Sequence, residues 1–223
     1  MLEHNHYERA AAAWLRSAGL AFVPVHERHR ASLGSAENAK GGTAEDTSTV
    51  KSPDFLLLGR GGTSLVVDVK GRRYPSGSAT AQASERVNSV IPGPWHLEPA
   101  PRLKTGGTWE CWVTLDDLDG LARWSARLGP GWDGLFLFTY WLDDSWFMPA
   151  APDLFQHDGR RYLFRCAQLQ EFRQNMRVRS RSWATVDLPV RAARRVVKPL
   201  GQIPGFEQVQ QGFTQVASNG ASR

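Results

Sequence analysis

The chain has 223 residues, of which 41% are hydrophobic and 22% charged, a mixture that is typical of a folded globular protein and argues against a disordered one. The formal net charge of +5 is unevenly spread. Residues 160–198 carry eleven Lys and Arg against two acidic residues, so this segment has a charge of +9 and the rest of the chain −4. A basic segment on a mildly acidic body favours a polyanionic partner.

Several classes of protein do not fit the sequence. The longest apolar run, residues 134–142, is far shorter than the ~20 residues of a membrane helix. The first residues also lack the pattern of a secretory signal. Cys111 and Cys166 lie in apolar runs typical of buried, reduced thiols, so we expect a cytoplasmic protein that does not bind membranes. His26 and His29 form a close pair with no third ligand nearby, which disfavours a metal site there.

The first half of the chain predicts a helix followed by antiparallel strands. Apolar residues at helical spacing predict a helix over 6–18, and an edge strand interrupted by a proline follows over 21–27. Residues 30–50 have little periodicity and are expected to form a mobile loop. Two apolar runs, 54–58 and 64–70, flank a glycine-rich turn and predict a hairpin.

The second half predicts a crossover and a basic extension. A long loop is expected over 71–108, with at most a short helix over 81–90. A strand over 109–115, a helix over 116–128 and a buried strand over 135–142 would then form a βαβ unit.

The C-terminal part is expected to add a hairpin and a helix. The hairpin would join 146–148 to 162–167, and the helix would run from Leu169 into the basic segment. The chain as a whole therefore predicts one α/β domain over residues 1–200, with a flexible tail over 201–223.

The residues best suited to chemistry are Asp54, Asp68 and Lys70, which lie on the predicted hairpin. Side chains alternate along a strand, so Asp68 and Lys70 share one face, and Asp54 opens the partner strand. Two carboxylates and an ammonium on one patch suit Mg²⁺ and the activation of water towards a phosphate. The alternative is a solvated strand face, but the unbroken run Leu65–Val67 indicates burial on both faces, where unpaired charges are costly.

This pattern, Pro53-Asp54…Asp68-Val69-Lys70 on a glycine-turned hairpin after an N-terminal helix, resembles the PD-(D/E)xK nuclease superfamily over residues 5–142. The resemblance implies a restriction-endonuclease-like core, with a central mixed sheet flanked by helices in the order αβββαβ, here followed by a basic helical C-terminal extension. It also implies that Asp54, Asp68 and the Val69 carbonyl bind Mg²⁺ or Mn²⁺ and that Lys70 serves the attacking water. The superfamily more often has Glu at the position of Asp68.

Glu8 is a further candidate for catalysis and metal binding, since many members of the superfamily carry an acidic residue on the first helix. The alternative is a capping box, in which Glu8 bonds back to the Asn5 backbone. The opening His6-Tyr7-Glu8-Arg9-Ala10 is also similar to a bacterial family with a HYExAFE motif, from which Ala11-Ala12 departs.

Two groups of basic residues are expected to contact phosphates. Lys51, Arg72 and Arg73 flank the motif, with solvated turn charges as the alternative. The other group lies along one face of the expected basic helix, with Trp183 beyond it for base stacking or for core packing, and contains Arg173, Arg177 and Arg181.

The sequence leaves three candidate functions for this protein. The first is a metal-dependent nuclease that hydrolyses phosphodiester bonds, with DNA as the expected substrate and a homodimer as a common assembly of such folds. The second is an inactive nucleic-acid-binding module of the same fold. The third is a scaffold whose arginines grip an acidic protein.

Overall fold

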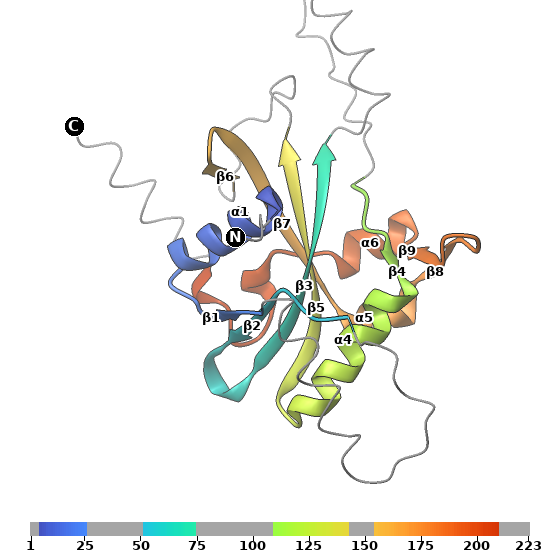
Figure 1. The fold of residues 1–223 in the computed structure, drawn as a ribbon, viewed down its shortest axis with the longest axis horizontal. Helices are drawn as coiled ribbons and strands as arrows, with labels where there is room; N and C mark the ends of the chain where they lie inside the picture. Colours follow the sequence, from blue (N-terminus) through green and yellow to red (C-terminus); the bar gives the residue numbers. More distant parts are fainter. Residues whose placement is uncertain (1–4, 26–50, 75–108, 143–153, 210–223) are drawn as a thin grey trace, which may run out of the picture.

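The computed structural model describes residues 5–25, 51–74, 109–142 and 154–209, and these form a mixed α/β fold (Figure 1). A six-stranded sheet has the order β1-β2-β3-β5-β7-β6, and a three-stranded sheet has the order β4-β9-β8. The larger sheet contains β1 Ala21–Pro24, β2 Phe55–Leu58, β3 Ser64–Tyr74, β5 Trp132–Leu142, β6 Leu154–His157 and β7 Arg160–Gln168. The smaller contains β4 Val113–Thr114, β8 Arg177–Ser180 and β9 Thr185–Asp187. The α-helices in the described ranges are α1 His6–Ser17, α4 Leu115–Leu128, α5 Leu169–Asn175 and α6 Val190–Val196.

The predicted hairpin is confirmed. Strands β2 and β3 pair antiparallel from Leu58↔Ser64 to Phe55↔Val67, and β1 is the expected edge strand. The turn between them is a short 3₁₀ helix, Arg60–Gly62, in which Gly61 and Gly62 have φ values of 69° and 83°. These left-handed conformations favour glycine.

Both faces of the central strands are covered, which explains their continuous apolar runs. One face packs under α1 and the segment 200–209, through residues that include Trp14, Val67 and Phe206. The other packs under α4 and α5, through residues that include Val66 and Phe136. Asp68 and Lys70 alternate with Val67 and Val69 along β3, so their side chains point to the α4 side.

The crossover differs from the predicted one. Strand β3 runs parallel to β5 from Ser64↔Trp132 to Tyr74↔Leu142, and α4 packs against both strands. The predicted strand 109–115 is wrong in extent and in place, because only β4 forms there and it pairs with β9 in the other sheet. The first strand of the parallel pair is therefore β3, which extends to Tyr74 through part of the expected loop.

The C-terminal region also requires corrections. The helix that begins at Leu169 ends at Asn175, and residues 177–180 form β8, because this segment pairs with β9. The expected flexible tail from residue 201 is wrong for residues 201–209, because Ile203, Phe206 and Val209 are buried in the core. Strand β7 pairs with β6, which begins at Leu154, after the segment 146–148 that was expected to form the hairpin.

Some expectations fall outside the described residues: the pair at 26 and 29, the loop 30–50, the short helix 81–90, the strand 146–148 and the tail beyond 209. Cys111 and Cys166 are buried and reduced, as predicted. Within the described ranges, no helix combines the length and apolar character needed to cross a membrane.

Candidate functional site

The candidate site lies where β2 and β3 separate. The last residue pair of their ladder is Phe55↔Val67, and the Asp54 N–H donates to the Val67 carbonyl at 2.8 Å. Beyond this point β3 continues alongside β5, and the Asp54 carboxylate accepts the Val69 N–H at 2.6 Å. The Asp54 carboxylate thus accepts a backbone hydrogen bond that a neighbouring strand would otherwise accept, and this bond holds it next to Asp68 and Val69.

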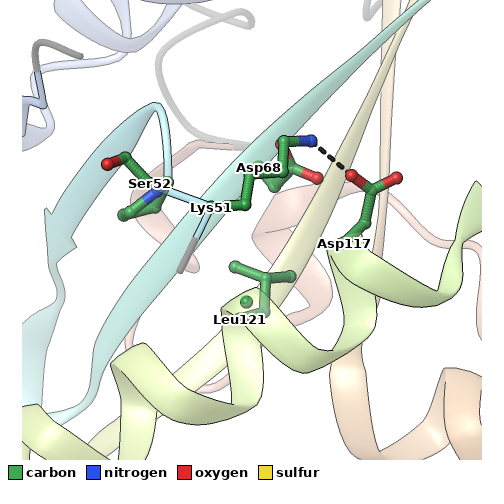
Figure 2. A pocket seen from close by; sticks show the side chains of 7 residues that line it. Lys51, Ser52, Asp68, Asp117 and Leu121 are labelled. Atoms are coloured by element: carbon green, nitrogen blue, oxygen red, sulfur yellow. Dashed lines mark hydrogen bonds and ion pairs between the residues drawn. The ribbon is translucent and has the colours of Figure 1, made fainter. Parts of the chain in front are cut away.

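Four charged side chains alternate in sign beside this point. Lys70 Nζ lies 2.6 Å from Asp68 Oδ2 and 2.9 Å from Asp117 Oδ2. Lys51 Nζ lies 3.3 Å from Asp68 Oδ1. It also pairs closely with Asp117 Oδ1, the contact drawn as a dashed line in Figure 2. Asp68 and Asp117 are 4% and 5% exposed, and Lys70 is nearly as buried. The two lysines therefore balance the two carboxylates in a largely desolvated position. This group of four is called the charge cluster below.

Asp117 was not predicted as a site residue. Its sequence position identified it only as an acidic residue in the first turn of a helix, and it does form a capping box with Thr114. The signal that was available is its place next to Leu118 and one turn before Leu121, both buried, whereas Asp116 is exposed. An acidic residue on the apolar face of an amphipathic helix indicates a buried partner.

The lysines set the protonation of Asp117. Burial alone would raise the pKa of this carboxyl, but Lys70 and Lys51 outweigh burial and lower it to about 2. In the same way, burial would lower the pKa of Lys51, and the carboxylates of Asp68 and Asp117 raise it instead. Asp117 and Lys51 are therefore both ionised at neutral pH.

Asp54 behaves in the opposite way. Burial and then the charge of Asp68 raise its pKa to about 7, with a smaller contribution from Glu8 and a partial offset from the Val69 N–H and Lys70. Glu8 lies half-buried on α1, the helix that packs on the face of the sheet opposite α4. Crowded carboxylates of this kind favour a bound proton or a bound cation.

The donor set fits a hard divalent cation in kind, since Asp54, Asp68, Glu8 and the Val69 carbonyl would offer only oxygen atoms. Asp68 Oδ2 is buried and lacks a hydrogen bond of good geometry among the described residues, although it contacts Lys70. However, no three His, Cys, Asp or Glu side chains in the described ranges are grouped closely enough to hold a metal ion.

The three basic residues that flank the motif, and that were expected to contact phosphates, lie in different environments. Lys51 points into the charge cluster. Arg72 is half-buried, donates to the Trp112 carbonyl, and places its guanidinium carbon 4.0 Å from the centre of the Trp112 ring. Arg73 is exposed, with its guanidinium over Trp141. Only Arg73 of the three presents an exposed charge.

The three arginines of the expected helix face do not share a helix. Arg173 lies on α5 and pairs with Asp119 at 3.0 Å. Arg177 lies on β8 and pairs with Asp187 at 2.8 Å. Arg181 is exposed in the turn that follows. The predicted helical surface is therefore wrong, although all three side chains reach solvent.

No protein-family model matches the chain, and no curated protein matches it either. Among solved structures, the chain has a distant similarity to that of Archaeoglobus fulgidus Hjc, a Holliday junction resolvase from an archaeal hyperthermophile. It shares 13% sequence identity with this chain at a TM-score of 0.42, covering 86% of this chain and 93% of that one.

Proposed function

We propose that this protein is a metal-dependent nuclease that hydrolyses phosphodiester bonds of nucleic acid, with DNA as the expected substrate. The observation that carries the proposal is the juxtaposition of Asp54, Asp68 and Lys70 at the point where β2 and β3 separate. A lysine beside two buried carboxylates costs folding free energy that an ordinary surface pair does not. Such arrangements cluster at functional sites.

In the proposed mechanism, Asp54, Asp68 and the Val69 carbonyl would hold Mg²⁺ or Mn²⁺, with Glu8 as a fourth candidate. When bound, the cation would make a coordinated water more acidic and offset negative charge on the phosphate. Lys70 orients the attacking water and stabilises the charge that develops on the phosphate oxygens. Asp117 holds the Lys70 ammonium next to Asp68, and Lys51 neutralises the second oxygen of each carboxylate.

The raised pKa of Asp54 supports this assignment. A carboxyl group whose pKa is about 7 is incompletely ionised at neutral pH, because burial disfavours its charge and because Asp68 and Glu8 repel it. A divalent cation would remove that repulsion and would deprotonate Asp54 on binding. Metal binding is therefore expected to release protons near neutral pH.

The experiment measures cleavage of supercoiled plasmid and of single-stranded DNA in Mg²⁺, in Mn²⁺ and in EDTA. Cleavage should require the metal and should be lost in Asp68→Asn and in Lys70→Ala. Asp116→Asn is the matched control, because Asp116 is an exposed neighbour of the charge cluster. Full activity in both site variants would refute the proposal.

A second candidate is a nucleic-acid-binding module that does not cut. The observation that favours it is that both oxygens of Asp68 are in ion pairs with lysines, as expected of a structural cluster. Salt-dependent DNA binding without cleavage in either metal would support this function instead.

A further inference from the structure

The hairpin of β8 and β9 projects from the smaller sheet, and Figure 1 shows its turn extending away from the body of the molecule. Residues 181–184 form this turn. Trp183 within it is 78% exposed, whereas most large aromatic side chains of the described residues are buried. An indole ring held in water is unfavourable unless a partner covers it.

The hairpin is connected to the strand that carries the site through the ring of Trp112. Arg179 and Arg72 both place their guanidinium carbons over the Trp112 ring, at 5.1 Å and 4.0 Å from its centre. Arg179 is at an irregularity in the β8–β9 pairing, and such bulges redirect a side chain. Since Arg72 follows Lys70 by two positions on β3, the Trp112 ring connects the hairpin to the strand that carries the site.

A second connection runs through β4. Thr114 pairs with Thr185 of β9, and the Leu115 N–H donates to the Ala184 carbonyl at 2.9 Å. Thr114 is also the residue that caps α4 and accepts the Asp117 N–H. The turn of the hairpin and the first turn of α4 are therefore fixed relative to each other, with Asp117 between the hairpin and Lys70.

The charge of the hairpin selects the partner. Its arginines are Arg177, Arg179 and Arg181, and its single acidic residue, Asp187, neutralises Arg177. Arg181 is exposed next to Trp183, and Arg179 lies 4.0 Å from Glu110. An exposed indole beside the exposed guanidinium of Arg181 suits a strand that offers both phosphates and an open base face.

We propose that the β8–β9 hairpin binds unpaired nucleotides of the substrate, with Trp183 stacking on a base and with Arg181 contacting the adjacent phosphate. This inference rests on the proposed function for the identity of the partner and adds the substrate class: nucleic acid with a single-stranded region. A base within a duplex has both faces covered by its neighbours, so the interior of a DNA duplex does not offer this contact.

The test measures binding of fluorescently labelled oligonucleotides by anisotropy in EDTA, where no cleavage occurs. For a single-stranded oligonucleotide, Trp183→Ala should weaken binding by about 5- to 150-fold, the range expected for loss of one stacked base. Trp183→Phe should retain most of the affinity. Arg181→Ala should reduce the salt dependence of binding by roughly one charge. Arg60→Ala, an exposed arginine on the β2–β3 turn, is the matched control and should bind like the wild type.

Three results would overturn the inference. The protein could fail to bind nucleic acid, or Trp183→Ala could bind single-stranded DNA with unchanged affinity. The third result is that Trp183→Ala loses as much affinity for blunt duplex DNA and for polyglutamate as it does for single-stranded DNA. The last would indicate a general polyanion surface.

A second substrate separates failure of the hairpin assignment from failure of the proposed nuclease function. Hydrolysis of a small chromogenic phosphodiester, which has no base to stack, should be lost in Asp68→Asn and unchanged in Trp183→Ala. A protein that hydrolyses nothing, yet loses single-strand binding in Trp183→Ala, would retain the hairpin assignment and refute the nuclease.

Discussion

The carboxylate of Asp117, in the first turn of α4, lies 2.9 Å from the ammonium of Lys70 on β3. Both side chains are buried, so removal of either one would leave the other without its closest opposite charge. The crossover helix therefore does more than cover the sheet, since its first turn also fixes the lysine next to Asp68.

Replacing Asp117 by Asn should destabilise the protein by about 2 kcal/mol at pH 7, because its pKa of about 2 lies below the ordinary value of 3.8. A lowered pKa in the folded state contributes stability above pH ~4, and that stability is lost as the pH falls through 2. Urea unfolding of the wild type and Asp117→Asn should therefore differ at pH 7 and converge towards pH 2. A difference that does not change with pH, or an equal loss in Asp116→Asn, would contradict the ion pairing.

Replacing Asp54 by Asn should have the opposite pH dependence. The pKa of Asp54 is raised to about 7, so the favourable contribution of its protonated form is present below pH ~4 and lost by pH 8. Asn keeps an acceptor for the Val69 N–H and carries no charge. Asp54→Asn should thus be more stable than the wild type at pH 8, by at least about 1 kcal/mol or roughly 2–4 °C in Tm, and should gain little at pH 4.

The variant Asp54→Asn also tests whether a divalent cation binds beside Asp54. At pH 8, Mg²⁺ should raise the Tm of the wild type more than that of Asp54→Asn, because the cation relieves a repulsion that the variant lacks. Equal Tm shifts in the two proteins would place the cation elsewhere.

Much of this arrangement follows from local sequence signals. The glycine turn, the apolar runs and the alternation along residues 64–70 identified the β2–β3 hairpin, and they placed Asp68 and Lys70 on one face. The position of Asp117 depends instead on how α4 packs against β3, and a cap explains an acidic residue in a first helical turn equally well.

The basic helix and the flexible tail were wrongly predicted because tertiary packing, which the local sequence does not reveal, decides both segments. Arg173, Arg177 and Arg181 recur at helical spacing, but pairing of 177–180 with β9 overrides that local preference. In the segment after Leu200, glutamines and glycines concealed a stripe at every third position, formed by Leu200, Ile203, Phe206 and Val209. The stripe is buried against the α1 side of the sheet, which could not be predicted from local composition.

Substitution of Phe206 tests that segment. The ring is fully buried, so Phe206→Ala should cost about 3–5 kcal/mol. Val178→Ala, at an exposed position of β8, should change stability by less than about 0.5 kcal/mol. Chemical denaturation measures both, and a small cost for Phe206→Ala would separate residues 200–209 from the core.

Gly71 tests the contact between α1 and β3. A Cβ at this position would overlap the ring of Tyr7 on α1, so Gly71→Ala should destabilise the protein by about 1–3 kcal/mol. Because the clash involves one ring, the double variant Gly71→Ala, Tyr7→Ala should recover part of the loss in a double-mutant cycle. Simple additivity of the two costs would show that the ring is not the obstacle.

The roles of Asp68 and Lys70 in metal-dependent phosphodiester hydrolysis are best tested by the single-turnover rate at saturating enzyme, because this rate is independent of substrate affinity. With Mg²⁺ and a partly single-stranded DNA, the wild type should cleave, and Asp68→Asn and Lys70→Ala should each be at least about 100-fold slower. Wild-type rates in both variants, or a wild-type rate that persists in EDTA, would contradict the account.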